Sequence, residues 1–425
     1  MYEYVQLTLI RGEIDKSKFP LLSYTYSLYN RIIYKILSID SFQIRSIELG
    51  VIKGGFKMAK NLWRKEIDQL TPYVPGKPIE DVKREYGITD ITRLASNESP
   101  YGPSPKAVDA MKEAVHKSWL YPEPTCRNLR EKLATRHDLS PEQFVIGNGA
   151  DHLITLIGHA FINKGDEVIY GMPTFMSYRE STLSMGGIPV EVPLTDDFVY
   201  DLDAIEEAIT ENTKLVYICN PNNPTGTILD SDQIVSFLEK VPSHVLVILD
   251  EAYIDFITEK DYRTGVELIK EDHRLISLRT FSKLHGLAGT RVGFAIGNEE
   301  ILSPLKAVRP TFEVNRIAIA GAEASLDNPS YSEKVLEKIV SETERLSKVY
   351  NDYGFDVIGT HANFMFIDVK QDAGELMEAL LKKGLIVRPC APWGLKTHLR
   401  ITVGTPEQNN HLIEAIKDIM ELENI

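Results

Sequence analysis

Four short segments of this 425-residue chain combine residue types that could do chemistry. The longest runs from Thr280 to Gly293, where Lys283 stands beside Ser282 and is followed by three glycines and Arg291. A lysine amine can act as a nucleophile or carry a proton, and an arginine beside hydroxyls binds anions. The alternative interpretation is a solvated lysine in a glycine-rich loop, and this segment alone does not decide between the two.

The other three segments lie where a predicted strand ends or a predicted helix begins. Asp250 closes an apolar run, the loop Cys219–Gly226 is rich in Asn and Pro, and Gly147–Asp151 is a glycine-containing turn. Ligands of parallel α/β sheets bind beyond the carboxyl ends of the strands, and backbone N–H groups at a helix start bind phosphate. Each segment alone is also typical of a surface carboxylate, a turn or an ordinary helix start.

Short apolar strands and the helices between them must position these segments. Strands are predicted at Glu167–Tyr170, Leu215–Cys219, Val245–Leu249, Leu275–Leu278 and Gly293–Ile296. Helices are predicted at Pro105–Lys117, Asn128–Arg136, Ala150–Phe161 and Leu202–Ala208. This alternation predicts βαβ units and therefore an α/β fold, with a mostly parallel sheet covered by helices on both faces.

The pattern changes after Pro310 to a smaller α+β unit. It contains a long amphipathic helix at Glu333–Tyr353 and strands at 363–369, 384–387 and 399–403. Before the large unit, two short helices at Asn61–Leu70 and Ile79–Tyr86 are separated by prolines, as in a leader that wraps. We therefore predict an N-terminal arm over 58–95, a large domain over 96–309 and a small C-terminal domain over 310–425.

Composition excludes several other classes of protein. The chain has 47 Lys and Arg against 61 Asp and Glu, a net charge of −14, which disfavours binding to nucleic acid or an anionic membrane. No window approaches the roughly 20 apolar residues of a transmembrane helix. Cys126, Cys219 and Cys390 are odd in number and widely spaced in the sequence, which is not the pattern of a disulfide framework or a metal-ligand cluster. A cytoplasmic protein without a metal is expected.

Residues 1–57 differ from the rest of the chain. They hold nine isoleucines, six tyrosines and no alanine, and their net charge is +3, from eight basic and five acidic residues. Lys53-Gly54-Gly55-Phe56-Lys57 can be back-translated into a ribosome-binding site ahead of Met58. Our hypothesis is an over-extended reading frame, and so a non-native or disordered extension; a genuine appendage is the alternative. A peptide from residues 20–45 in the native protein would overturn the hypothesis.

Together, the four segments resemble the fold-type I pyridoxal-phosphate aminotransferases, most closely the histidinol-phosphate aminotransferase group. The resemblance extends from about Leu70 to Val403 and is carried by Ser282-Lys283 through Arg291 and by Asn223-Pro224-Thr225-Gly226. It implies a large domain that binds pyridoxal 5′-phosphate and a smaller α+β domain. It also implies an amino donor and 2-oxoglutarate as substrates.

The same resemblance implies roles for residues around the cofactor. Lys283 would form the Schiff base with the cofactor aldehyde and later move the substrate Cα proton. Asp250 would hold the pyridine nitrogen protonated, and Tyr253 and Asn223 would donate to the 3′ oxygen. Phe175 would stack on the ring, with core packing as its alternative. The phosphate group would be held by Gly149, Ala150, Asp151, Thr280, Ser282 and Arg291.

Substrate residues also follow from the resemblance. Arg400 matches an arginine that grips a substrate carboxylate or phosphate, Arg388 matches a second phosphate-binding arginine, and Asn97 matches a substrate-site asparagine. Tyr121 resembles a tyrosine that crosses to the neighbouring subunit's cofactor phosphate, and Tyr73 one that reaches the partner's substrate site. These two matches imply a homodimer with shared active sites.

The implied activity is transamination of L-histidinol phosphate with 2-oxoglutarate, giving imidazole acetol phosphate and glutamate in histidine biosynthesis. An aromatic aminotransferase acting on Phe or Tyr is the main alternative, and a decarboxylase of threonine phosphate on the same scaffold is a third. A cofactor-sensing transcription regulator would need a basic helix-turn-helix ahead of the catalytic part. Residues 1–57 lack a convincing recognition helix.

Overall fold

The computed structural model describes residues 62–72, 78–271 and 274–420. The chain divides into two compact units, Met1–Lys65 and Glu66–Ile425. The hypothesis about residues 1–57 and the match at Tyr73 lie outside the described residues. Within those residues, no helix is both long enough and apolar enough to cross a membrane.

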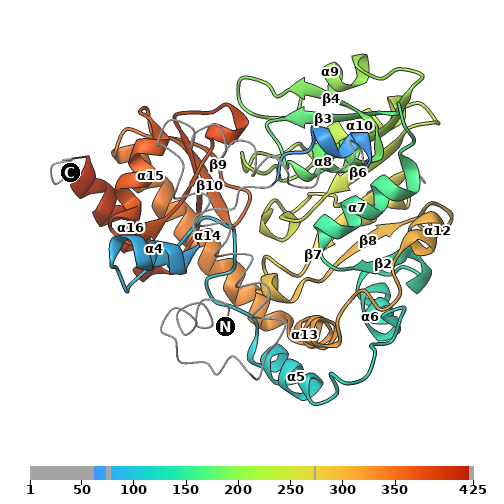
Figure 1. Ribbon diagram of the computed structural model, residues 1–425, viewed down its shortest axis with the longest axis horizontal. Helices are drawn as coiled ribbons and strands as arrows, with labels where there is room; N and C mark the ends of the chain where they lie inside the picture. The colour runs from blue at the N-terminus through green and yellow to red at the C-terminus, as the bar shows by residue number, and fades with distance from the viewer. Residues whose placement is uncertain (1–61, 73–77, 272–273, 421–425) are drawn as a thin grey trace, which may run out of the picture. The chain divides into compact units, whose positions relative to one another are not determined.

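A seven-stranded sheet forms the centre of the second unit, and it confirms the predicted α/β fold (Figure 1). Its strands, in spatial order, are β2 (Phe144–Gly147), β8 (Gly293–Gly297), β7 (Leu275–Thr280), β6 (Leu246–Asp250), β5 (Thr213–Cys219), β3 (Glu167–Met172) and β4 (Ile188–Pro193). All neighbours pair in parallel except those of β8, which runs antiparallel to both β2 and β7. The carboxyl ends of β5, β6 and β7 therefore lie side by side.

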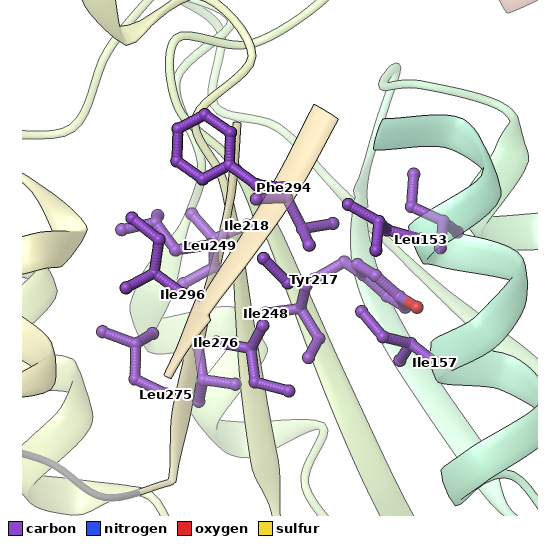
Figure 2. Packing of buried hydrophobic residues seen from close by; sticks show 14 of the residues in the cluster. Leu153, Ile157, Tyr217, Ile218, Ile248, Leu249, Leu275, Ile276, Phe294 and Ile296 are labelled. Carbon is purple, nitrogen blue, oxygen red and sulfur yellow. The ribbon is translucent and has the colours of Figure 1, made fainter. Parts of the chain in front are cut away.

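Helices flank this sheet and bury its apolar strands. They are α5 (Pro105–Val115), α6 (Arg127–His137), α7 (Ala150–Phe161), α8 (Ser177–Met185), α9 (Leu202–Glu207), α10 (Ser231–Lys240), α11 (Gly265–Ile269) and α12 (Glu299–Val308). Figure 2 shows Leu153 and Ile157, one turn apart on α7, facing strand residues that include Tyr217 and Ile248. Every residue of β6 is buried, as expected for a central parallel strand covered on both faces.

The small domain is built on a four-stranded antiparallel sheet. Its order is β12 (Arg388–Pro389), β13 (His398–Thr402), β10 (Phe364–Asp368) and β9 (Asp356–Gly359). Three helices accompany it, namely α14 (Pro329–Asp352), α15 (Ala373–Leu381) and α16 (Pro406–Ile419). The long helix α14 buries Val335, Ile339, Leu346 and Tyr350, so one face of it closes this second core.

Two predicted elements differ from the structure. The helix predicted at 61–70 is only a short 3-10 helix, η3 (Lys65–Gln69), and it buries no residue that could dock a longer helix. The strand predicted at 384–387 is β11 (Leu385–Ile386), which pairs in parallel with β1 (Thr92–Arg93) of the N-terminal arm. The arm also contributes α4 (Ile79–Tyr86), as predicted.

Helix α13 (Arg316–Leu326) packs with the large domain, although it follows residue 310. Ala318 and Ala322 belong to the large core, and a Cβ at Gly321 would lie 3.0 Å from Met111 of α5. Small residues let α13 approach α5 closely, and the two helices lie together in Figure 1. Residue 310 therefore does not separate the two cores.

Candidate active site

A cavity of about 320 Å³ opens where β5, β6 and β7 end, and the small domain supplies part of its wall. This is the edge where open α/β sheets bind ligands. Most of the predicted site residues line the cavity, namely Asn97, Ala150, Asp151, Phe175, Asn223, Asp250, Tyr253, Thr280, Ser282, Lys283, Arg291 and Arg400. Segments more than 300 residues apart in the sequence, such as those of Asn97 and Arg400, therefore meet in one place.

Lys283 lies in the loop that follows β7, with its amine in the cavity. Its Nζ donates to the carbonyl oxygen of Asn97 at 3.3 Å and lies 5.1 Å from the centre of the Tyr253 ring. Within the described residues, no carboxylate forms an ion pair with this amine. The amine is thus available for covalent chemistry or for proton transfer.

Asp250 is the last residue of β6 and is buried. Its Oδ2 accepts a hydrogen bond from the Tyr178 hydroxyl at 2.7 Å, and its Oδ1 accepts one from the Ala252 N–H at 3.1 Å. Burial nevertheless raises the pKa of Asp250 to about 6, because these two bonds only partly replace the lost hydration. A cationic N–H donor in the cavity would stabilise the carboxylate.

Tyr178 is a site residue that the sequence did not reveal. It lies on α8, 72 residues before Asp250 in the chain, and is fully buried against Tyr217, with ring centres 4.5 Å apart. Burial raises the pKa of its hydroxyl well above the usual value, so it remains a proton donor to Asp250. No local sequence pattern distinguishes it from a core aromatic residue.

Asn97 connects the arm, the large domain and the small domain. Its Nδ2 donates to the Tyr253 hydroxyl at 2.9 Å, and its Oδ1 accepts from the Thr402 hydroxyl at 3.2 Å. The Asn363 amide donates to its carbonyl oxygen at 3.0 Å. Its φ of 56° is in the left-handed region, which asparagine tolerates better than most residues. These contacts fix Tyr253 beside the lysine.

One end of the cavity is suited to an anion. Gly149 caps the start of α7, and a Cβ there would lie 2.5 Å from Arg291 Nη2, so glycine lets the guanidinium approach the helix start. Arg291 donates to the Ala288 carbonyl at 3.1 Å and to Ser282 Oγ at 3.4 Å. Thr280 Oγ1 lies 3.0 Å from the same hydroxyl. A helix N-terminus, two hydroxyls and an arginine together form a phosphate-binding arrangement.

Two arginines lie opposite each other on the small-domain sheet. Arg388 of β12 and Arg400 of β13 are paired in register, so their side chains leave the same face as close neighbours. Arg400 lines the cavity and is held by the Asn223 Oδ1 and the Ala95 carbonyl, both at 2.6 Å. Arg388 lies outside the cavity lining, with its guanidinium carbon 5.9 Å from the centre of the Trp393 ring.

Tyr121 does not reach the cavity of its own chain. Its side chain is 78% exposed and stacks on Phe312, with ring centres 4.7 Å apart. Gly149 borders the cavity through Arg291 but is absent from its lining. The structure thus assembles the predicted set around one cavity, except for Tyr121, Arg388 and the undescribed Tyr73.

A lysine amine, a buried carboxylate and an anion-binding helix start at this sheet edge define a site of the fold-type I aminotransferase class. The chain belongs to the aminotransferase class I and II family, whose sequence profile matches residues 89–416. It is similar to the histidinol-phosphate aminotransferase of Caldicellulosiruptor saccharolyticus, at 40% identity over 84% of this chain and 100% of that enzyme. The corresponding enzyme of Moorella thermoacetica is 42% identical, over 84% of this chain and 92% of that one.

A solved structure of a histidinol-phosphate aminotransferase is also similar to this chain. The histidinol-phosphate aminotransferase from Sinorhizobium meliloti, solved in complex with pyridoxal-5′-phosphate, superimposes with a TM-score of 0.78 at 29% identity. The match covers 85% of this chain and 99% of that one. The resemblance drawn from the four sequence segments is therefore confirmed, as is the fold class.

Proposed function

We propose that this enzyme transfers the amino group of L-histidinol phosphate to 2-oxoglutarate, producing imidazole acetol phosphate and glutamate in histidine biosynthesis. The observation that carries the proposal is the similarity of about 40% to histidinol-phosphate aminotransferases along nearly their whole length. The paired arginines of the small domain support it independently, because two like charges side by side favour a doubly charged anion between or above them.

The residues of the cavity fit pyridoxal 5′-phosphate as the cofactor. A buried carboxylate with a raised pKa needs a cationic N–H partner, which a protonated pyridine nitrogen provides to Asp250. At the other end, the Gly149 position leaves room for Arg291 only because glycine has no Cβ. We assign the phosphate group to the amides of Gly149, Ala150 and Asp151, together with Thr280, Ser282 and Arg291.

When bound, this cofactor withdraws electrons from the amino donor and makes its Cα proton acidic. Lys283 would hold the cofactor and could carry that proton, because its amine is not committed to a carboxylate among the described residues. Asp250 would keep the ring nitrogen charged, and the Tyr178 hydroxyl holds Asp250 in its orientation. Tyr253 and Asn223, which line the cavity, would donate to the 3′ oxygen, and Phe175 would cover the ring.

We assign the substrate anions to the two arginines. Arg400 is held rigidly by two acceptors at 2.6 Å and faces the cavity, so it is suited to an anion near the reacting end. Arg388, its neighbour across the β12–β13 pair, is suited to the more distant phosphate. Asn97 completes the substrate side through its contact with Tyr253.

One observation favours the aromatic aminotransferase as a second candidate. Arg400 lines the cavity but Arg388 does not, and a single arginine is enough to hold the carboxylate of phenylalanine or tyrosine. In that case Arg388 would have no role in substrate selection. The two candidates therefore make opposite predictions for variants of Arg388.

We further propose that the enzyme works as a homodimer in the cytoplasm, with Tyr121 of each subunit completing the other's site. Large apolar side chains are exposed beside this tyrosine, namely Trp119, Leu120 and Phe312. Exposed apolar groups gathered in this way mark contact surfaces. The three cysteines are free and buried, which suits a reducing compartment.

Product analysis tests the proposed function. Purified enzyme loaded with pyridoxal phosphate should convert L-histidinol phosphate and 2-oxoglutarate into equal amounts of imidazole acetol phosphate and glutamate. Absence of glutamate would contradict transamination, and release of carbon dioxide from O-phosphothreonine would favour a decarboxylase. Sedimentation analysis should show a dimer, and mixing Tyr121→Phe subunits with Lys283→Ala subunits should reveal whether Tyr121 acts in the other subunit's site.

A further inference from the structure

The loop between β12 and β13 holds Trp393 in a fixed position. Trp393 ends the short helix η7 (Ala391–Trp393), and its backbone N–H donates to the Cys390 carbonyl oxygen at 2.9 Å. The backbone N–H of Cys390 in turn donates to the carbonyl oxygen of His398 at 2.9 Å, which closes the base of the loop. Gly394, with a φ of 84°, lets the chain turn back directly after the tryptophan. The indole is therefore placed by backbone geometry.

This indole makes two contacts that point in different directions. Its Nε1–H donates to the carbonyl oxygen of Thr174 in the large domain at 2.7 Å. Its ring lies 5.9 Å from the guanidinium carbon of Arg388, within the range of a cation–π interaction. The side chain is half-buried between these partners. Trp393 thus contacts both an arginine assigned to substrate and the large-domain segment that precedes Phe175.

The large-domain partner leads directly to the cavity. Thr174 is buried, and its hydroxyl donates to Asn222 Oδ1 at 2.7 Å. The Asn222 amide donates to the Pro173 carbonyl at 3.0 Å, so the segment 173–174 is held from both sides. The next residue is Phe175, which lines the cavity. The hydrogen bond from Trp393 therefore fixes the backbone immediately before this ring.

We propose that Trp393 is a positioning residue that gives the enzyme its preference for a phosphate-bearing substrate. The inference rests on the proposed function, since it takes Arg388 as the phosphate-binding arginine. The indole face restricts the long Arg388 side chain before substrate arrives, so less conformational entropy is lost on binding. The indole N–H keeps this arginine at a constant distance from the Phe175 wall, and so from the reacting end of the substrate.

Two substitutions separate the two contacts. Trp393→Phe keeps an aromatic face under Arg388 but removes the N–H that fixes the distance to the Phe175 wall, so the ratio of kcat/KM for histidinol phosphate to that for phenylalanine should fall about twofold. Trp393→Leu removes the aromatic face as well, and the same ratio should fall about five- to tenfold. The loss should appear mainly in KM, because the phosphate does not react. Trp63→Phe, a change at an exposed tryptophan that does not line the cavity, is the matched control.

A binding measurement gives a readout that does not depend on turnover. The chain has three tryptophans, so Trp63→Phe combined with Trp119→Phe leaves Trp393 as the only one. Adding inorganic phosphate to this cofactor-loaded enzyme should change its tryptophan fluorescence in a saturable way. Histidinol phosphate should compete, and the change should disappear when Arg388→Ala is added. A fluorescence signal that does not respond to phosphate would overturn the role of Trp393, even if Trp393→Leu fails to fold.

Failure of this inference can be told apart from failure of the proposed function. If wild type prefers histidinol phosphate and Arg388→Ala loses that preference while Trp393→Leu keeps it, Trp393 has no role in specificity and the proposed function stands. If wild type itself does not prefer histidinol phosphate to phenylalanine, the proposed function fails first. A merely structural role for Trp393 would lower kcat/KM for both substrates equally, and that result would also overturn the inference.

Discussion

Replacing Asp250 by asparagine should remove the activity and yet stabilise the cofactor-free protein at neutral pH. The side chain is fully buried, and its carboxylate accepts only the Tyr178 hydroxyl and the Ala252 N–H among the described residues. An asparagine has the same shape and can accept from Ala252 through its oxygen. The Tyr178 hydroxyl can rotate to accept from the new amide. The substitution therefore removes a buried charge without removing the hydrogen bonds.

The magnitude follows from the pKa of Asp250, which burial raises from 3.8 to about 6. Because the folded-state pKa is above the unfolded-state value, ionisation costs folding free energy that is absent below the lower pKa and complete above the higher one. Each pKa unit corresponds to about 1.4 kcal/mol, so the cost is about 1.5 kcal/mol near pH 5 and about 3 kcal/mol near pH 7.5. The stability of cofactor-free wild type relative to Asp250→Asn should fall over this window.

Urea unfolding followed by far-ultraviolet circular dichroism measures the difference. Cofactor-free Asp250→Asn should have the higher midpoint near pH 7.5, and the difference should be about halved near pH 5. Midpoints should be compared at constant slope, since a chain with two cores need not unfold in one step. Adding pyridoxal phosphate should stabilise wild type more than the variant. A variant no more stable than wild type at neutral pH, or a difference independent of pH, would refute the reasoning.

Four further predictions concern the rest of the site. Lys283→Ala should abolish transamination and the visible absorbance of the lysine-bound cofactor while circular dichroism stays unchanged, because Lys283 is not part of the core; a variant with the wild-type rate would contradict its role. Gly149→Ala should weaken cofactor binding at least tenfold in equilibrium dialysis, since its φ of 91° and the 2.5 Å approach of Arg291 both exclude a Cβ, and unchanged affinity would place the phosphate elsewhere. Arg388→Ala should raise the KM for histidinol phosphate about ten- to a hundredfold and leave that for phenylalanine near wild type, as expected for a charge-assisted fork of roughly 1.5–3 kcal/mol. Arg400→Ala should instead impair both donors and the glutamate half-reaction, and selective loss of one donor would show that its anion is not shared.

The central part of the fold could be predicted because its strands are buried on both faces. Strand β6 and its parallel neighbours appear in the sequence as short apolar runs, and glycines mark the start of α7 at Ala150. Strand β4 was missed, since it lies at the sheet edge, is largely exposed and contains Pro189 and Pro193. The predicted domain boundary at residue 310 places α13 in the small domain, whereas Ala318 and Ala322 of α13 pack in the large core, a contact that the sequence does not display.

Only those site residues could be predicted whose neighbours in the sequence indicate their chemistry. Lys283, Asp250 and the turn at Gly149 stand in segments that indicate their chemistry, and the cavity brings them together. The pairing of Arg388 with Arg400 depends on strand register, which the sequence does not display. The contact between Trp393 and Thr174 spans 219 residues and depends on how the two domains meet.

The central claim is that this enzyme is built for a phosphate-bearing amino donor. The most direct test is steady-state kinetics of the wild-type enzyme with L-histidinol phosphate, phenylalanine and tyrosine, each with 2-oxoglutarate under the same conditions. Our account predicts that kcat/KM for histidinol phosphate exceeds that for either aromatic amino acid by at least about tenfold, the value of one charge-assisted anion contact. Equal or higher values for phenylalanine or tyrosine would contradict it and identify an aromatic aminotransferase.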